Sequence, residues 1–386
     1  MRFSVDAHAI GCHLTGNEVY IRNLLQEFPV LDPQAEFTAY LSMEGAPAWI
    51  PGRVAREWVS KNPFRRLGFD LPRKLLRSRP DLIHVQYTAP LYCPVPVVVS
   101  VHDVSFLEHP EYFTRFRSLQ LRLTVHRTVR SAARVLTPSE FSRQAILDAY
   151  GLDPRKVVVV PNGVSSTFRP VLRETALSRI QSRFHIPGPF ILTVGDLQPR
   201  KNHVGLIRAF EDLLRANPQL PHRLVMVGKN TWYTPEVRRA AAASPVAGRI
   251  HFAGFVEDED LLHFYGACDL FVFPSFYEGF GLPILEAMAC GRAVACSNTS
   301  AMPEVANAAG LLFDPHSTRE MTRAMEDLLL DTELRTRTER LGGHHAALYS
   351  WRETARKTLD VYYEVAGAGT RAAAGKARRV SAGGRG

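Results

Sequence analysis

Short runs of apolar, mostly β-branched residues recur along the chain and alternate with helical stretches. In the first half these runs lie at residues 3–10, 81–88, 95–103, 134–139 and 156–163. In the second half they lie at residues 190–196, 222–229, 249–255, 269–275, 292–298 and 310–315. Strands that alternate with helices predict parallel β-sheets built from βαβ units, and therefore an α/β fold.

The alternation pauses near residues 165–188, where prolines flank a single helical stretch. A chain of 386 residues is long for one hydrophobic core. We therefore predict two Rossmann-like, doubly wound domains, the first over residues 1–168 and the second over residues 188–349. Ligands of such sheets bind beyond the carboxyl ends of the strands, so a cleft between the domains is the expected place for a site.

The end of the chain is predicted to leave the second domain. Residues 350–366 place Trp351, Ala355, Leu359 and Tyr362 at helical spacing, which indicates an amphipathic helix that crosses back over the domain boundary. Residues 367–386 are rich in Gly, Ala and Arg and hold five basic and no acidic residues. We expect this segment to be a disordered basic tail.

Composition excludes several classes of protein. The five cysteines form no C-x-x-C pair, the N-terminus lacks the apolar core of a signal peptide, and no apolar run is long enough to span a membrane. These features favour a cytoplasmic protein. The formal net charge of +9 lies in the first half and the tail, and no nucleic-acid-binding motif accompanies it, so no nucleic-acid partner is expected.

Residues 271–297 combine a buried strand, a glycine-rich loop with Glu278, Gly279 and Gly281, and a helix that carries Glu286. Glycines allow backbone amides to approach a ligand, and a helix N-terminus attracts anions. The pattern favours an anion-binding site. On spacing alone, Glu286 as a partner of the helix dipole and Glu278 as a solvated loop acid are equally acceptable.

A second polar group follows the apolar run at 190–196. The predicted strand ends at Gly195, and the next loop presents Arg200 and Lys201 before Asn202, which is placed to cap the following helix. Two cations beside a helix terminus suit a diphosphate. A solvated basic loop is the alternative.

The first half offers weaker candidates. His102 and Asp103 follow an apolar strand, so they are expected at its carboxyl end. Gly16 opens the first helix, where its lack of a side chain leaves backbone amides accessible to a phosphate. A single histidine is more often structural than catalytic, and one glycine is a weak signal.

Taken together, these segments resemble the retaining, nucleotide-sugar-dependent glycosyltransferases of the GT-B fold in family 4, also called glycosyl transferases group 1. The resemblance rests on EGFGLPILEAMACG, which matches the family's pair of glutamates eight positions apart, and on PRKN, PNGV and the strand-terminal HD in the family's order. It runs from the first strand to about residue 365. It implies two Rossmann-like domains that face each other across a cleft.

The resemblance also implies roles for individual residues. Glu278 is similar to the glutamate that contacts the donor sugar, and Glu286 to the one that binds the ribose hydroxyls. The backbone at Gly279, Phe280, Gly281 and Leu282 is implied to face sugar and phosphate. Phe255 and Val256 are implied to meet the base through their backbone.

The remaining implied roles concern the diphosphate and the acceptor. Arg200 and Lys201 are similar to the cations that hold the diphosphate, Gly195 and Gly16 to glycines beside it, and His102 to the histidine near donor sugar and acceptor. Many members have Arg directly after the strand-terminal glycine. Asp196 stands there in this chain, a variant typical of a mannosyltransferase-like subgroup.

The activity implied is transfer of a hexosyl group, with GDP-mannose as the expected donor, to a hydroxyl of a glycan or lipid-linked oligosaccharide. Glucosyl or other hexosyl transfer from a UDP- or ADP-sugar, and a donor-binding but inactive scaffold, are the alternatives. No cofactor or metal is expected. Asp258 and Asp260 form a D-x-D string, but first-turn acids of a helix are explained by its dipole.

The acceptor side rests on residues 115–130, a strongly basic stretch. It is either a helix that contacts anionic lipid at the inner face of the cell membrane or an ordinary Arg-coated surface helix. The arginines in this stretch do not gather on one helix face.

Overall fold

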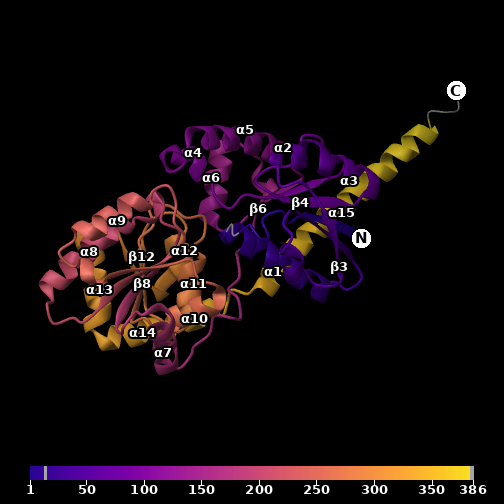
Figure 1. The fold of residues 1–386 in the computed structure, drawn as a ribbon. Helices are drawn as coiled ribbons and strands as arrows, with labels where there is room; N and C mark the ends of the chain where they lie inside the picture. The colour runs from indigo at the N-terminus through magenta and orange to yellow at the C-terminus, as the bar shows by residue number, and fades with distance from the viewer. Residues whose placement is uncertain (13–14, 383–386) are drawn as a thin grey trace. The chain divides into compact units, whose positions relative to one another are not determined.

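The computed structural model describes residues 1–12 and 15–382, which form two compact units. Unit 1 consists of Met1–Gly163 together with the chain from Trp351 onward, and unit 2 of Val164–Ser350. The division therefore falls at Gly163, just before the proline-flanked pause of the sequence. Figure 1 follows the chain through both units.

Unit 1 is built on a parallel seven-stranded sheet with the order β3-β2-β1-β4-β5-β6-β7. Its strands are β1 (Arg2–Asp6), β2 (Glu36–Leu41), β3 (Val54–Trp58), β4 (Leu82–Gln86), β5 (Val97–Ser100), β6 (Arg134–Thr137) and β7 (Val157–Val159). Its helices are α1 (Thr15–Leu31), α2 (Pro63–Arg65), α3 (Leu71–Ser78), α4 (Ser105–Glu108), α5 (Arg115–Ser131), α6 (Glu140–Tyr150) and α15 (Trp351–Ala382).

Two strands of unit 1, β2 and β3, were missing from the sequence prediction. In β3 every residue after Val54 is exposed because the strand forms the edge of the sheet, so it carries no apolar run. In β2, buried and half-buried positions hold Thr38 and Tyr40 as well as aliphatic residues. Hydrophobic runs identify only strands that are covered on both faces.

Unit 2 has a parallel six-stranded sheet with the order β10-β9-β8-β11-β12-β13. Its strands are β8 (Phe190–Val194), β9 (Arg223–Val227), β10 (Ile250–Gly254), β11 (Leu270–Phe273), β12 (Val294–Ser297) and β13 (Leu311–Phe313). Its helices are α7 (Arg173–Phe184), α8 (His203–Ala216), α9 (Thr234–Ala243), α10 (Asp258–Ala267), α11 (Leu282–Ala289), α12 (Met302–Ala306), α13 (Thr318–Leu330) and α14 (Thr332–Ala346). All six strands predicted for this half are present.

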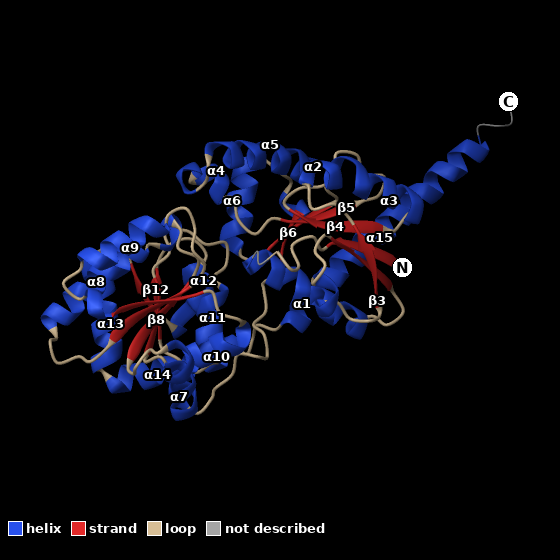
Figure 2. Ribbon diagram, viewed as in Figure 1, coloured by secondary structure: helices blue, strands red, loops and turns tan. Residues whose placement is uncertain are grey.

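Helices cover both faces of each sheet, which places a hydrophobic layer on either side (Figure 2). In unit 2, α8, α9 and α13 pack on one face, and α7, α10, α11, α12 and α14 on the other. In unit 1, α3, α5 and α6 share one face, while α15 packs beside α1. Both sheets are therefore doubly wound, as the sequence predicted.

The amphipathic helix predicted at 350–366 is the first half of α15. Trp351, Ala355, Leu359 and Tyr362 are buried, so the helix returns the chain to unit 1. The polar atoms on this buried face are paired. The Tyr362 hydroxyl lies 2.6 Å from Nδ1 of the buried His84, whose Nε2 lies 2.7 Å from Oγ of Ser100.

The tail prediction differs from the structure. The segment 367–386 was expected to be disordered, but α15 continues to Ala382. Alanine, arginine and lysine have high helix propensity, and these residues follow directly on a helix that is already formed. Residues 383–386 lie outside the described part of the chain. Within the described part, no helix is both long enough and apolar enough to cross a bilayer.

We expect Tyr362→Phe to lower the free energy of unfolding by about 1–3 kcal/mol, because it leaves Nδ1 of His84 buried without a partner. Urea denaturation followed by circular dichroism measures the loss. Tyr92→Phe is the matched control: that residue is 61% exposed, so a change within about 0.5 kcal/mol is expected. Equal losses in the two variants would contradict the assignment.

Candidate active site

Four loops gather at one edge of the unit 2 sheet. Because all its strand pairs are parallel, the carboxyl ends of β8, β9, β10 and β11 lie on the same side. The loops that follow carry the residues that sequence reasoning selected in this half of the chain. The site of unit 2 is therefore built at the edge where open α/β sheets bind ligands.

A buried ion cluster forms the centre of this edge. The Arg200 guanidinium lies 2.6 Å from Oε2 of Glu278, and the Lys201 ammonium lies 2.6 Å from Oε1 of the same carboxylate. Glu278 and Lys201 are buried. The two polar groups that the sequence placed in separate motifs thus meet, and the cluster carries one net positive charge.

Local structure positions the two loops against each other. Arg200 lies in the 3₁₀ turn Pro199–Lys201, and its carbonyl accepts a hydrogen bond from the amide of Phe276. Its side chain donates to the Tyr277 carbonyl at 3.1 Å. Gly195 lies against the Lys201 side chain. A Cβ at this position would lie 3.1 Å from the aliphatic carbons of Lys201, so the glycine makes room for that side chain.

The charges of the cluster are set by its burial and by mutual pairing. Burial alone would raise the pKa of Glu278, but the charges and hydrogen bonds of Arg200 and Lys201 outweigh it and lower this pKa to about 2. Burial lowers the pKa of Lys201, an effect that Glu278 opposes. The carboxylate is therefore ionised throughout the physiological pH range.

The second glutamate of the signature has a different environment. Gly281 has φ of +105°, a conformation that favours glycine, and it precedes the first residue of α11, Leu282. One turn into α11, Glu286 accepts a hydrogen bond of 2.9 Å from the Tyr265 hydroxyl. Burial raises the pKa of Glu286 to about 7, although the Tyr265 hydrogen bond and the charge of Lys201 oppose the rise.

The remaining predicted residues of unit 2 divide into surface and core. Phe255 follows β10 with its ring 44% exposed, while Val256 and Phe280 are buried in the hydrophobic core. The side chains of Val256 and Phe280 pack in the core, so any ligand contact at these two residues is made by the backbone. Gly279 lies in the same loop as Glu278.

Sequence reasoning missed Lys229, the cation that follows β9. Its ammonium lies 4.9 Å from the centre of the Phe255 ring, and its amide donates to Oδ1 of Asp196 at 3.2 Å. Asp196, the departure from the family pattern, thus joins the loops after β8 and β9. The sequence signal that could have identified Lys229 is its position directly after Gly228, the glycine that follows this strand.

One smaller expectation is corrected. Asn202 does not cap α8 through its side chain; it adopts a left-handed backbone conformation and donates to the Pro315 carbonyl at 2.8 Å.

The D-x-D string lies in the first turn of α10, as the sequence predicted. Asp260 is also buried and paired with Arg179 at 2.9 Å and Arg183 at 3.1 Å. Among the described residues, no group of three or more His, Cys, Asp or Glu is arranged to hold a metal ion.

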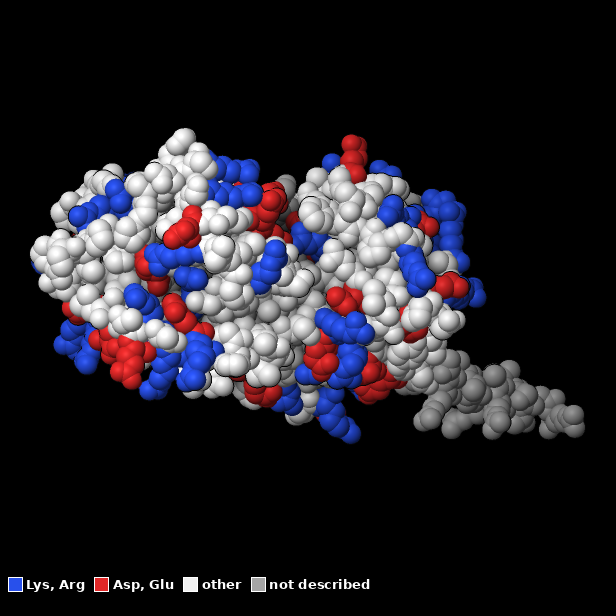
Figure 3. All heavy atoms as spheres, turned by 90° about the horizontal axis from the view of Figure 1, so that it is seen from below, with Lys and Arg blue, Asp and Glu red and all other residues white. Residues whose placement is uncertain are grey.

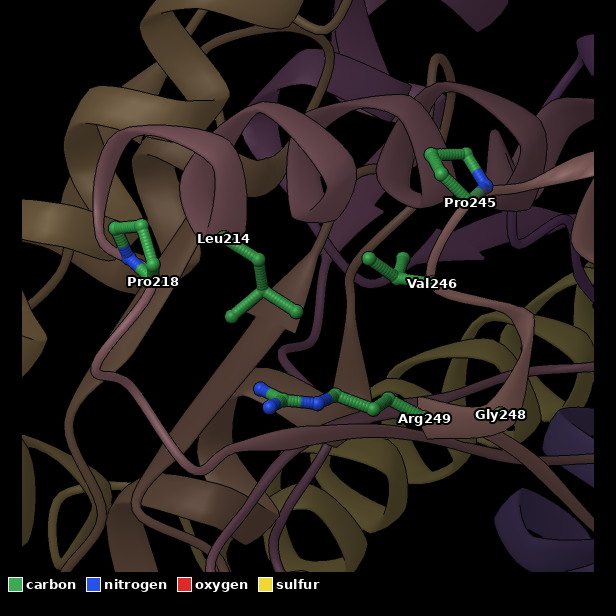
Figure 4. Close-up of a pocket in the computed structure, with 6 residues that line it drawn as sticks. All are labelled: Leu214, Pro218, Pro245, Val246, Gly248 and Arg249. Atoms are coloured by element: carbon green, nitrogen blue, oxygen red, sulfur yellow. The ribbon is translucent and has the colours of Figure 1, made fainter.

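The pocket drawn in Figure 4 lies elsewhere. It has a volume of about 320 Å³ and is lined by Leu214, Pro218, Pro245, Val246, Gly248 and Arg249. Arg249 directly precedes β10, so this pocket is at the amino ends of the strands, opposite the ion cluster. Its one charged side chain donates to the Leu220 carbonyl, and it contains no acid, base or nucleophile.

Unit 1 carries its own polar group at the carboxyl ends of β4 and β5. Nε2 of His102 lies 3.0 Å from Oε1 of Gln86, and burial lowers the pKa of His102 to about 4. Gly16 lies exposed in the first turn of α1, and a Cβ there would meet nothing within 4 Å. Packing therefore does not require this glycine. Gln86 was not selected from the sequence.

Comparison with known proteins agrees with this architecture. A family model described as glycosyl transferases group 1 matches residues 177–342, and one described as glycosyltransferase family 4 matches residues 15–168. The O-antigen chain mannosyltransferase B of Escherichia coli is 33% identical over 265 residues, covering 69% of each chain. This chain belongs to the group 1, family 4 glycosyltransferases. It is therefore a glycosyltransferase enzyme.

Other relatives differ in their substrates. The serotype-specific mannosyltransferase WbdA of Escherichia coli is 32% identical over 63% of this chain, which corresponds to 30% of that longer protein. A D-inositol 3-phosphate glycosyltransferase of Kineococcus radiotolerans is 32% identical over 73% of this chain and 71% of its own. Alr3699/HepE of Anabaena, solved with UDP and glucose, superposes with a TM-score of 0.74 at 20% identity over 93% of this chain and 98% of that chain. The glycosyltransferase therefore has the GT-B fold.

The raised pKa of Glu286 predicts a pH-dependent stability. Below pH 4.5 the carboxyl is protonated in both states, whereas between 4.5 and 7 it ionises only on unfolding, so stability falls as pH rises through this range. Relative to Glu286→Gln, the wild type should lose up to about 3 kcal/mol between pH 5 and pH 8. Urea denaturation at several pH values measures this difference. The exposed Glu333→Gln on α14 should show none, and a flat difference for Glu286→Gln would disprove the assignment.

Proposed function

We propose that the enzyme transfers a mannosyl group from GDP-mannose to a hydroxyl of a glycan or lipid-linked oligosaccharide, with retention of anomeric configuration. The observation that carries the proposal is the buried cluster of Arg200, Lys201 and Glu278 at the carboxyl edge of unit 2, beside the N-terminus of α11. The mannosyltransferases of Escherichia coli at 32–33% identity support the choice of sugar.

The cluster suits a nucleoside diphosphate as leaving group. Cleavage of the bond to the anomeric carbon increases negative charge on the diphosphate, and fixed cations stabilise that charge without reorganisation. Arg200 and Lys201, together with the amides at the start of α11, supply positive potential at one edge. Glu278 holds both cations in place and offers its oxygens to sugar hydroxyls. No metal ion is part of this proposal.

Glu286 is proposed to bind the ribose hydroxyls. Its ionised form accepts two hydrogen bonds, and the neighbouring charge of Lys201 favours that form. Because these roles occupy both glutamates, we favour same-face internal return over a double displacement. In that mechanism a diphosphate oxygen removes the proton from the acceptor hydroxyl as the new bond to the anomeric carbon forms.

The acceptor is proposed to lie at a membrane surface. Helix α5 exposes three apolar residues at one helical spacing: Phe116 is 72%, Leu119 56% and Leu123 65% exposed. From residue 112 to residue 139 the chain has six arginines and no Asp or Glu. An apolar row within a basic, acid-free segment suits a bilayer that contains anionic lipid.

Neighbouring segments extend this surface. Arg127 of α5 donates to the carbonyls of Ala89, Pro90 and Leu91, which fixes the exposed Leu91 and Tyr92 beside the helix. The Leu91 amide donates to the Leu67 carbonyl in the turn 66–70, where Phe69 is exposed. We call Phe116, Leu119, Leu123, Leu91, Tyr92 and Phe69 the apolar surface of unit 1.

A second candidate is transfer of glucose or another hexose from a UDP- or ADP-sugar. The solved complexes of HepE with UDP-glucose and the inositol phosphate glycosyltransferase relative favour it. A nucleic-acid partner has less support, because basic and acidic side chains are interspersed on the face drawn in Figure 3.

A thermal-shift panel with GDP, UDP, ADP, GDP-mannose and UDP-glucose tests the donor. A ligand that binds only the native state raises the melting temperature, and about 2.7 kcal/mol of stabilisation is expected at 100 times its dissociation constant. We expect a shift with GDP and GDP-mannose that is lost in Glu286→Ala and kept in the exposed Glu333→Ala. A shift with the uridine ligands alone would replace the proposal by the second candidate, and no shift with any of the five ligands would contradict both candidates.

Vesicle flotation tests the membrane surface. The wild type should float with vesicles that contain phosphatidylglycerol and less with pure phosphatidylcholine. A Phe116→Ser, Leu119→Gln, Leu123→Gln variant should lose most of this binding while its response to the donor nucleotide is unchanged. The control replaces Leu172 and Leu348, exposed residues of unit 2, by Gln. Equal binding by the two variants would contradict the surface assignment.

A further inference from the structure

Gln86 is the last residue of β4, and its side chain connects two other elements of unit 1. Only 6% of the residue is exposed. Its Nε2 donates a hydrogen bond of 3.1 Å to the carbonyl of Asn17 in the first turn of α1. Its Oε1 lies 3.0 Å from Nε2 of His102, which follows β5. One amide thus bridges the two positions at which unit 1 was expected to contribute to the site.

These contacts determine where the proton of His102 lies. The Asn17 carbonyl can only accept a hydrogen bond, so the NH₂ group of Gln86 must face α1, and its oxygen must face His102. That oxygen also can only accept. Nε2 of His102 therefore carries the hydrogen, and Nδ1 of the neutral ring has a free lone pair.

Burial favours the same neutral form. It lowers the pKa of His102 to about 4, although the charge of Asp103 opposes the shift. Among the described residues, the buried His84, whose pKa burial lowers to about 3, and the rings of Tyr20 and Tyr87, at 4.8 and 5.8 Å from the imidazole centre, also lie near the ring. His84 is therefore uncharged at neutral pH and places no positive charge beside His102.

Asp103, the acid adjacent to His102 in sequence, does not orient the imidazole. Its Oδ1 accepts hydrogen bonds from the amide of Ser105 at 2.9 Å and from the Ser105 hydroxyl at 2.6 Å. The aspartate is therefore engaged with the first residue of the short helix α4. In a histidine–aspartate pair the acid would contact the imidazole. Here Gln86, from the neighbouring strand β4, makes that contact.

We propose that Gln86 is a positioning residue that fixes His102 as the Nε2–H tautomer, so that Nδ1 accepts a hydrogen bond from a sugar hydroxyl. This inference rests on the proposed function for the identity of its ligand, but the tautomer itself does not. Because the same amide holds Asn17, Gln86 also fixes the first turn of α1 next to Gly16. A substitution of Gln86 therefore affects both the His102 imidazole and the first turn of α1.

Nitrogen-15 NMR of histidine-labelled protein tests the tautomer without any substrate. The signal of His102 is assigned by its absence in His102→Asn. In the wild type we expect Nε2 to be protonated and Nδ1 unprotonated from pH 6 to pH 8. Gln86→Leu should abolish this preference, and Gln86→Glu, which puts a carboxylate beside Nε2, should raise the pKa of His102 toward neutrality. A proton on Nδ1 in the wild type, or an unchanged titration in Gln86→Glu, would overturn the proposal.

Transfer kinetics test the consequence. Gln86→Leu should lower kcat by about 10- to 100-fold, since a misplaced hydrogen-bonding group loses catalysis on this scale. Gln86→Glu should move the acid limb of the pH–rate profile upward and regain activity at high pH. Gln144→Glu, the same charge change at an exposed position on α6, is the control and should match the wild type.

The NMR and kinetic experiments together distinguish failure of the positioning role from failure of the proposed function. Nucleotide binding by unit 2 and the unfolding midpoint report whether each variant is folded. If the tautomer changes in Gln86→Leu and the transfer rate does not, the positioning role is refuted. If no donor supports transfer in any protein, the proposed function fails, while the NMR titration still decides whether Gln86 fixes His102.

Discussion

The carboxylate of Glu278, held between Arg200 and Lys201, is the constraint around which unit 2 is organised. A buried carboxylate is strongly destabilising unless paired charges and hydrogen bonds replace its water. Here one ammonium and one guanidinium do so, and the pKa of Glu278 falls to about 2 as a result. The pairing ties the loop after β8 to the loop after β11, so the site is formed as part of the fold.

Other features of this edge follow from the same constraint. Gly195 is small because the stem of Lys201 lies against it, and the ammonium lies 4.6 Å from the centre of the Phe273 ring. Glu286 accepts a hydrogen bond from the Tyr265 hydroxyl, and burial keeps its pKa near 7 although the charge of Lys201 opposes the rise. The two glutamates of one motif thus differ in pKa because their surroundings differ.

In unit 1, hydrogen bonds between neutral side chains connect the elements, where unit 2 uses ion pairs. Gln86 connects α1 to His102, and the buried His84 connects Ser100 to Tyr362 of α15. In the Gln86 chain the Asn17 carbonyl can only accept, so it decides which atoms donate, whereas the hydroxyls of Ser100 and Tyr362 beside His84 can each donate or accept. The neutral network at Gln86 thus fixes a tautomer, whereas the charged cluster of unit 2 fixes an electrostatic potential.

The sequence by itself determined the α/β class, the two similar halves and the six strands of unit 2, because runs of apolar residues are the direct signature of strands buried on both faces. Ordered motifs also identified Glu278, Glu286 and the Arg200–Lys201 pair. Tertiary structure alone decided that Glu278, Arg200 and Lys201 form one ion cluster, that β2 and β3 complete the first sheet, and that the His102 imidazole contacts the side chain of Gln86. The physical reason is that each of these depends on contacts between residues far apart in the chain, or on burial that an edge strand does not show in its sequence. A local pattern records which face of an element is covered, but not by which partner.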